Sequence, residues 1–357
     1  MGFLRIAGAA LAASFLCGLP ASAQSTGDWN ATVAAAKQEG ALTISAPSGR
    51  EWRDQLLEFQ KAYPEIKVSA TEFASRDFWP RILKEREAGQ YLWDFRIGGP
   101  DVASYNIKNQ GLMAPIRPLL ALPEVTDPSK WMGGIDGLFA DKEKQYFLAF
   151  TAYESENVYY NRTIIPSLTM KELIDPRWKG KISLADPRGG AALVTLGVLQ
   201  MTYGDGFIKT LVADQQPVVT KEPRQQMDWL ASGRYPIGFG LPNIAFVEYA
   251  ARGARIDDFV TASGLRIVSI GVGGVQMPSR PPHPNASKLF INWLLTRDVQ
   301  ARLMQAIKLN SRRLDVPPGA PDRLVDPKLI AEYVPAQGEE IQPHQQKVAA
   351  LLRQYLK

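Results

Sequence analysis

The stretch KISLADPRGGAA, residues 181–192, decides the fold of this chain. The apolar residues Ile182–Ala185 predict a short buried strand, and Asp186-Pro187 ends it. Gly189-Gly190 then lets the backbone turn, and the apolar run AALVTLGVLQ, residues 191–200, begins a helix. A strand, a glycine turn and a helix in this order are typical of α/β domains.

The start of this helix is a candidate anion-binding site. The first N–H groups of a helix have no intrahelical partner and carry the positive end of its dipole. Gly189, Gly190 and Ala191 would offer such groups, and the guanidinium of Arg188 could clamp a carboxylate or phosphate beside them. The alternative is an ordinary strand–helix junction with a solvated arginine.

The first 23 residues read as a cleavable secretory signal peptide. They hold a basic residue near the start, an apolar run over residues 6–19, and the small-residue site Ala21-Ser22-Ala23 before Gln24. The only cysteine, Cys17, lies inside this segment, so we expect no disulfide and no thiol chemistry in the mature protein. Beyond the signal we expect no membrane-spanning segment, and the expected location is the periplasm.

Composition narrows the class of partner. The 357 residues are 45% hydrophobic and 22% charged, which suits a globular chain of two domains. The 41 basic and 36 acidic residues give a formal net charge of +5 and are spread along the chain. Without a basic block or a nucleic-acid motif, no nucleic-acid partner is predicted. The mild positive bias suits attraction of a small anion.

Helical and strand-like patterns alternate along the chain. Trp52, Leu56 and Phe59 follow helical spacing, and an alternating strand pattern follows them at residues 66–70. Such alternation predicts α/β layers with mostly parallel sheets. Further helices are expected over residues 29–40, 78–89, 101–110, 223–232, 244–252, 286–307 and 340–357, and further strands over residues 41–45, 92–98, 145–150, 157–161, 235–239, 265–271 and 273–278.

Several short motifs occur in a recognisable order. They are Ser48-Gly49-Arg50, Asp94-Phe95 before Gly98-Gly99, Tyr159-Tyr160-Asn161-Arg162, PRWKGKI at residues 176–182 and KLFINWLL at residues 288–295. Together they resemble the solute-binding proteins of bacterial ABC importers, specifically the subgroup that contains the ferric-ion-binding proteins. The resemblance implies an α/β, two-lobe periplasmic-binding-protein fold of type II. Each lobe would be a mostly parallel sheet flanked by helices, and the lobes would close by a hinge on a ligand held in the cleft.

The resemblance also implies domains and partners. We expect one lobe from residues 24–150 plus 271–315, a second from residues 151–270, and a C-terminal helical extension from residues 316–357. The partners would be a membrane permease with its ATPase, and the protein would be a monomer.

The ferric members hold iron through a His, a Glu and a Tyr pair, with an anion at a helix N-terminus. The matching positions here are Ser48-Gly49-Arg50, Gly98-Gly99 and Leu241-Pro242-Asn243. These residues lack the anionic oxygen donors that Fe(III) requires. Tyr159-Tyr160 lies on a strand, where alternation points the two rings to opposite faces. We therefore predict no metal and no cofactor, and keep iron as an alternative.

The remaining candidates suit a small organic anion, and each has a structural alternative. The loop at 48–50 could be an exposed turn, Gly98-Gly99 could be a tight turn instead of offering N–H groups, and Asn243 could only cap a helix. Tyr153 near the hinge and Arg224 in the 223–232 helix complete the set. The candidate ligand-binding residues are Ser48, Gly49, Arg50, Gly98, Gly99, Tyr153, Arg188, Gly189, Gly190, Ala191, Arg224 and Asn243.

Catalysis would need a nucleophile with a base, or paired groups for proton transfer. His283 and His344 lie in polar, proline-flanked surroundings, and Glu154 and Glu156 read as solvated. The predicted function is therefore capture of a small anionic organic solute for an ABC importer, without catalysis. The alternatives are binding of ferric ion or a metal–anion complex, and an enzyme that uses the same fold.

Overall fold

The structure is a computed structural model that describes residues 26–47, 49–73, 75–154, 157–188, 190–241, 248–258 and 265–356. The predicted signal peptide, the site residues Ser48, Gly189 and Asn243, Glu156, and the first residues of the predicted 244–252 helix lie outside these ranges.

The first large sheet has five strands in the order β2-β1-β3-β12-β4. β1 pairs in parallel with β2 and β3, whereas β12 is antiparallel to both β3 and β4. Four strands therefore run in one direction and β12 in the other, which confirms a mostly parallel sheet. The strands are β1 (Ala41–Ala46), β2 (Lys67–Glu72), β3 (Phe95–Ile97), β4 (Phe147–Ala149) and β12 (Gly274–Gln276).

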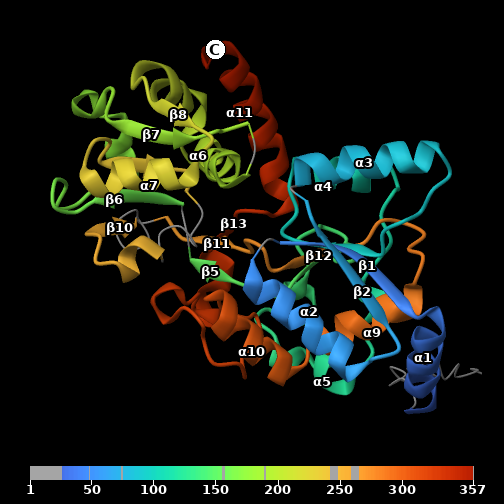
Figure 1. The fold of residues 1–357 in the computed structure, drawn as a ribbon. Coiled ribbons are helices and arrows are strands. Elements are labelled where there is room, and N and C mark those ends of the chain that lie inside the picture. Colours follow the sequence, from blue (N-terminus) through green and yellow to red (C-terminus); the bar gives the residue numbers. More distant parts are fainter. Residues whose placement is uncertain are drawn as a thin grey trace, which may run out of the picture.

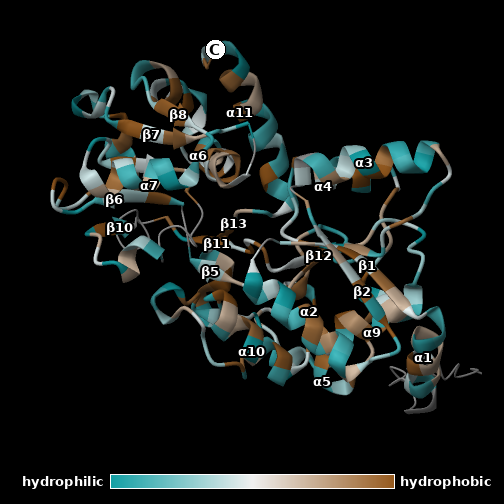
Figure 2. Cartoon of the chain, in the orientation of Figure 1, coloured by the Kyte–Doolittle hydropathy of each residue, from teal (hydrophilic) through white to brown (hydrophobic). Residues whose placement is uncertain are grey.

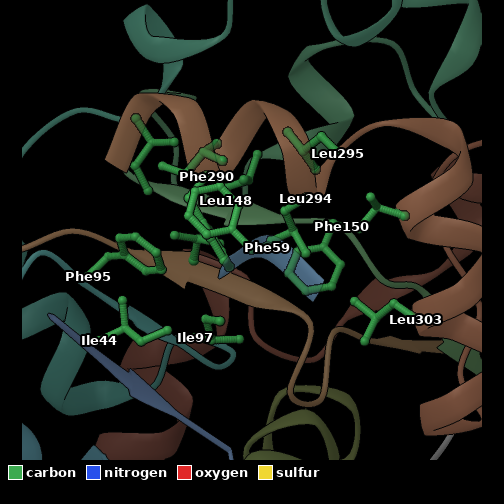
Figure 3. Packing of buried hydrophobic residues seen from close by; sticks show 14 of the residues in the cluster. Ile44, Phe59, Phe95, Ile97, Leu148, Phe150, Phe290, Leu294, Leu295 and Leu303 are labelled. Carbon is green, nitrogen blue, oxygen red and sulfur yellow. The ribbon is translucent and has the colours of Figure 1, made fainter. Parts of the chain in front are cut away.

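Helices cover both faces of this sheet, with α3 and α4 on one face and α2, α9 and α10 on the other (Figure 1). Trp52, Leu56 and Phe59 form the buried stripe of α2, as their spacing predicts. Phe59 meets Phe290 of α9 with ring centroids 4.9 Å apart, at the centre of the core in Figure 3. The helices are α1 (Thr26–Glu39), α2 (Arg50–Ala62), α3 (Ser75–Glu87), α4 (Val102–Asn109), α5 (Pro123–Thr126), α9 (Pro284–Leu294) and α10 (Arg297–Ile307).

The single helix expected over residues 286–307 is wrong, because α9 ends at Leu294 and α10 begins at Arg297. Thr296 between them has an extended backbone (φ −65°, ψ 151°). Side chains bond the carbonyls at the break: Gln300 Nε2 donates to Leu294 O (2.8 Å), and Arg313 Nη1 donates to Leu295 O (2.8 Å). These bonds satisfy helix-end acceptors that a continuous helix would satisfy itself.

The second large sheet has the order β10-β6-β9-β7-β8. β7 pairs in parallel with β8 and β9, and β6 is antiparallel to β9 and β10. Tyr160 packs in the core under α6, while Tyr159 packs with Met227 and Leu230 of α7, so the two rings point to opposite faces as predicted. The elements are β6 (Val158–Asn161), β7 (Ile182–Ala185), β8 (Val218–Thr220), β9 (Ile237–Phe239), β10 (Ile256–Asp258), α6 (Gly190–Lys209), α7 (Pro223–Ser232) and α11 (Gln342–Tyr355).

α6 corrects the expectation that no segment beyond the leader could span a membrane. By length and composition alone, residues 190–214 could do so, with half of the apolar window buried inside the protein. Leu196 and Leu199 pack against the sheet, and Val348 and Leu352 of α11 join the same core. The helix is therefore apolar because the sheet and α11 both cover it; β7, against which it packs, is hydrophobic in Figure 2.

A small third sheet lies between the two large ones (Figure 1). Its order is β13-β11-β5, with β5 at Tyr153–Glu154, β11 at Ile267–Ser269 and β13 at Val334–Pro335. β5 follows β4 of the first sheet, and β11 precedes β12, so two connections between the large sheets pass through it. The chain thus forms two α/β lobes with a strand-built junction between them.

Candidate functional site

The candidate residues gather at the carboxyl ends of parallel strands. Gly49 and Arg50 follow β1, and Gly98 and Gly99 follow β3. In the second lobe, Arg188 follows β7 and Arg224 follows β8, and β7, β8 and β9 end at one edge because they are parallel neighbours. Ligands of open α/β sheets bind outside such carboxyl ends.

Arg188 lies at this edge, but its guanidinium already has a partner. Nε donates to Asp186 Oδ1 and Nη2 to Asp186 Oδ2, both at 2.7 Å. The hydrogen bonds from Arg188 hold the pKa of Asp186 below its usual range. The side chain of Arg188 is 72% exposed, so a soluble anion can reach it. A ligand would therefore compete with Asp186, which the sequence pattern indicates only as the end of a strand.

Glycines bring the loop after β9 against the start of α6. Gly190 opens α6 with φ +64°, and Ala191 follows it. Gly240 has φ +80°, and a Cβ on it would lie 2.8 Å from Cα of Ala192. Gly240 therefore lies directly against the first turn of α6. Gly240 was not among the predicted residues, although only its lack of a side chain allows this approach.

Gly98 and Gly99 use their N–H groups inside the protein. Gly98 N donates to Gly274 O (2.7 Å), and Gly99 N donates to Gly271 O (3.0 Å). Their two carbonyls accept from Nε2 of Gln276. The acceptors lie on the segment that leads into β12, so these bonds do not fit the expectation that the two N–H groups face a ligand.

Tyr153, on the junction sheet, contacts Gly271, the residue whose carbonyl accepts from Gly99 N. Its hydroxyl lies 2.5 Å from where a Cβ on Gly271 would be, and the residue is 5% exposed. Burial raises the pKa of the Tyr153 hydroxyl, and a hydrogen bond with Ser269 opposes this rise. The structure thus brings Tyr153 and Gly99 together around Gly271, with the hydroxyl inside the junction.

The two remaining arginines are exposed. Arg50 is the first residue of α2, after Gly49 with φ +123°, and its Nε lies 3.4 Å from Asp54 Oδ2. Arg224 is exposed on the first turn of α7, where its carbonyl accepts from the Tyr249 hydroxyl (3.4 Å). Both add positive charge at the carboxyl edges of their sheets.

Sequence reasoning missed a buried cation behind the Gly98 turn. Arg96 on β3 is 9% exposed, and its Cζ lies 2.8 Å from the place of a Gly98 Cβ. Within the described residues, its Nε and Nη1 have no hydrogen-bond partner. Burial lowers the pKa of Arg96, and the charge of Asp101 opposes this effect. An arginine in a short strand pattern gives no sign that it is buried.

Comparisons with known proteins agree with this fold. The family model for bacterial extracellular solute-binding proteins matches residues 55–327. Apo ferric-ion-binding protein A of Pasteurella haemolytica is similar over 88% of this chain and 98% of its own, with a TM-score of 0.68 and 14% identity. No curated protein matches the chain.

Two further solved structures are similar. The substrate-binding protein of an ABC transporter from Agrobacterium tumefaciens covers 89% of this chain and 94% of its own, with a TM-score of 0.67 and 16% identity. AfuA from Actinobacillus pleuropneumoniae, with exogenous fructose-6-phosphate bound, is similar over 89% of this chain and 98% of its own, with a TM-score of 0.66 and 17% identity. At these identities the neighbours establish the two-lobe fold, while the family model covers most of the chain. The chain therefore belongs to the bacterial extracellular solute-binding proteins.

Proposed function

We propose that this solute-binding protein captures a small organic anion between its lobes by hinge closure and delivers it to the permease and ATPase of its importer. The observation that carries the proposal is the exposed Arg188 beside the start of α6. The two form a cationic edge on the second lobe, next to the loop that follows β9.

The geometry of Arg188 supports a carboxylate or phosphate as the recognised group. Two parallel bonds to Asp186 show the guanidinium in the bidentate arrangement that it makes with an oxyanion. A ligand oxyanion that replaces the Asp186 carboxylate would gain the same two bonds. It would also meet the first N–H groups of α6, where the helix dipole favours negative charge.

Within this proposal the protein is exported by cleavage after residue 23 and works as a monomer without catalysis. One lobe comprises residues 24–150 and 271–315, and the other residues 151–270. α11 moves with the second lobe, because Val348 and Leu352 are buried in the core that α6 forms. Contacts from the ligand to both lobes would favour the closed form.

Ferric-ion binding is the second candidate, favoured by the names of several structural neighbours. The residues at the matching positions do not provide the donor atoms that ferric ion requires. Gly49-Arg50 and Gly98-Gly99 stand where the resemblance places a His and a Glu, and they offer Fe(III) no anionic oxygen. AfuA, by contrast, was solved with fructose-6-phosphate, which belongs to the class of organic anions proposed here.

A ligand screen with three variants tests the proposal. Purified protein is titrated with sugar phosphates, phosphonates, dicarboxylates and Fe(III)-citrate, and unfolding temperature and Kd are measured. An anion at 100 times its Kd should add about 2.7 kcal/mol to the free energy of unfolding. Arg188→Ala should weaken binding roughly 10- to 150-fold, since hydrogen bonds to charged groups contribute about 1.5–3 kcal/mol.

Asp186→Asn removes the competing carboxylate and should tighten anion binding by up to about fivefold, as expected for an exposed ion pair. Arg177→Ala is the matched control, since Arg177 is 51% exposed and also pairs with an acidic neighbour, Asp175, two residues before it. Its affinity should equal that of wild type. Equal affinity of wild type and Arg188→Ala for the best anion would overturn the proposal, and stabilisation by Fe(III) alone would favour the ferric alternative.

A further inference from the structure

Arg96 places a positive charge on the buried face of β3 that α3 and α4 cover. Its neighbours Phe95 and Ile97 pack into the core with α2 and α9, so alternation along the strand points Arg96 to the opposite face of the sheet. On that face it lies between Ser45 of β1 and Gln276 of β12, its partners in the two neighbouring strands. All three residues are buried, so a polar row crosses the sheet beneath α3 and α4.

The side chain of Arg96 runs along β3 toward the carboxyl end of the strand. Its Nη2 lies 2.9 Å from the place that a Cβ on Gly98 would take, so the guanidinium occupies the space that this glycine leaves. In Figure 1, β1, the parallel neighbour of β3, runs from α1 on the outside of the first lobe toward the second lobe. The guanidinium therefore lies at the edge of the sheet that faces the second lobe.

Within the described part of the chain, no carboxylate pairs with this cation. Nε and Nη1 of Arg96 are enclosed and have no hydrogen-bond partner, and the unbonded Ser45 hydroxyl and Gln276 Oε1 beside them carry no charge. Asp101 is the acidic residue whose charge reaches Arg96. Its Oδ1 is already engaged at the start of α4, where it accepts from the backbone N–H and the hydroxyl of Ser104, both at 3.0 Å.

The third nitrogen of the guanidinium, Nη2, is the part of Arg96 that a ligand can reach. It has no hydrogen bond among the described residues either, but it is not enclosed as Nε and Nη1 are. Burial lowers the pKa of Arg96, because water solvates its charge poorly. A charge in such surroundings attracts an opposite charge more strongly than an exposed one does. An oxyanion at this edge would therefore gain a charge-assisted hydrogen bond from Nη2.

We propose that Arg96 is the first-lobe anchor of the solute, and that the captured solute carries an acidic group at each end, one for Arg96 and one for Arg188. This inference rests on the proposed capture of an anion at Arg188. A solute with a single acidic group would leave one of the two cations without a counter-ion when the lobes close. Dicarboxylates and phosphonocarboxylates meet this requirement, whereas a sugar with one phosphate does not.

A comparison of diacids with their monoamides tests the proposal by calorimetry. The probes are succinate, glutarate, adipate and 3-phosphonopropionate, each beside the form in which one carboxylate is an amide. The amide keeps the length of the solute and removes one charge. Wild type should bind at least one diacid, and the monoamide of that diacid should bind roughly tenfold or more weakly, as expected for loss of a charged hydrogen-bond partner. Equal affinities for the two forms would overturn the proposal.

Arg96→Met should lower the affinity for the diacid by roughly tenfold or more, and the preference for the diacid over its monoamide should disappear. An apolar side chain of similar size replaces an unpaired buried charge here, so the variant should unfold at no lower temperature than wild type. Arg117→Met is the matched control, since Arg117 is a first-lobe arginine that pairs with Asp136. Its affinity should equal that of wild type.

The two arginine variants separate this inference from the proposed function. Anion binding that weakens in Arg188→Ala but not in Arg96→Met would support capture at Arg188 and overturn the first-lobe anchor, leaving ordered water as the partner of the buried guanidinium. Binding that weakens in Arg96→Met but not in Arg188→Ala would instead overturn the site on the second lobe. Binding of monoacids alone by wild type would overturn the requirement for two acidic groups and leave the proposed function standing.

Discussion

Gly99 touches the backbone of Gly271 so closely that no side chain fits between them. A Cβ on Gly99 would lie 2.6 Å from the carbonyl oxygen of Gly271. The N–H of Gly99 donates to that same oxygen at 3.0 Å, so the two segments cannot move apart without losing this hydrogen bond. The glycine is required here by the packing of the junction, whatever ligand the protein binds.

Gly99→Ala should lower the free energy of unfolding by about 1–3 kcal/mol, because the inserted methyl must displace backbone. Urea unfolding of wild type and variant measures the difference. Gly206→Ala is the control, since a Cβ there meets nothing within 4 Å, and this change should be neutral or stabilise by up to about 1 kcal/mol. Equal stability of Gly99→Ala and wild type would contradict the crowding described.

At this scale, the positions of some candidate site residues could be predicted from the sequence, and their role in binding remains a prediction. Arg188 and Gly190 follow from the strand, turn and helix pattern, because that pattern is local. The pairing of Arg188 with Asp186, two residues earlier, could have been inferred from the Asp-Pro-Arg spacing. The burial of Arg96 could not be inferred, since a buried cation in a strand leaves no local pattern.

The segment after α10 links several elements of the first lobe through the side chain of Arg313. Arg313 is 1% exposed on its side chain, and its guanidinium lies 5.1 Å from the centre of the Trp131 ring. It makes two bonds to Asp315, Nε to Oδ1 at 2.9 Å and Nη2 to Oδ2 at 3.0 Å. A third bond, to Leu295 O, fixes the end of α9.

Asp315→Asn should lower the free energy of unfolding by about 1–3 kcal/mol at pH 7, because a buried arginine loses one of its two charged partners and keeps only Glu124, whose Oε2 accepts from Nη1 at 3.2 Å. The bonds from Arg313 hold the pKa of Asp315 below its usual range. The stabilisation is therefore present above the unfolded pKa of about 3.9 and is lost as the pH falls through the lower folded pKa.

Denaturant unfolding at several pH values checks this effect. The difference between wild type and Asp315→Asn should shrink below about pH 4. Asp298→Asn, at a carboxylate that is 79% exposed, should lower the free energy of unfolding by less than about 1 kcal/mol. A difference between wild type and Asp315→Asn that stays constant down to pH 2 would contradict the assignment.

Elements with clear periodicity were predictable. α2 shows its buried stripe in the sequence, and α7 begins at Pro223 and ends before Gly233 with φ +76°, as the sequence indicates. The break between α9 and α10 was not predictable, because the side chains of Gln300 and Arg313 that bond the free carbonyls there leave no periodic pattern. Periodicity reports which face is buried, but it does not report which side chains replace helical hydrogen bonds.

At the scale of the whole molecule, the two cores form around separate sheets and the junction sheet joins them. One core contains α2, α9 and α10, and the other contains α6 and α11. Separate cores allow the lobes to move as rigid bodies. The order of features along the sequence predicted this two-lobe fold, whereas the residue boundaries of the lobes remain a prediction.

Saturation with the anion found in the screen should compact the molecule. Small-angle X-ray scattering should show the radius of gyration falling toward about 20 Å, the value for a single compact chain of this size. Arg188→Ala should need a proportionally higher ligand concentration for the same change. A radius of gyration that stays constant while binding saturates would exclude lobe closure as the mode of capture.

The position of β12 sets the order in which the first lobe can fold. β12 lies inside its sheet, between β3 and β4, and Gln276 donates to Gly98 O across 178 positions of the chain. During synthesis, β3 therefore lacks its neighbour β12 until most of the chain exists. Contacts of such long sequence separation slow folding. A chain that must cross a membrane before it folds gains time from this delay, because its first lobe remains incomplete and can be threaded.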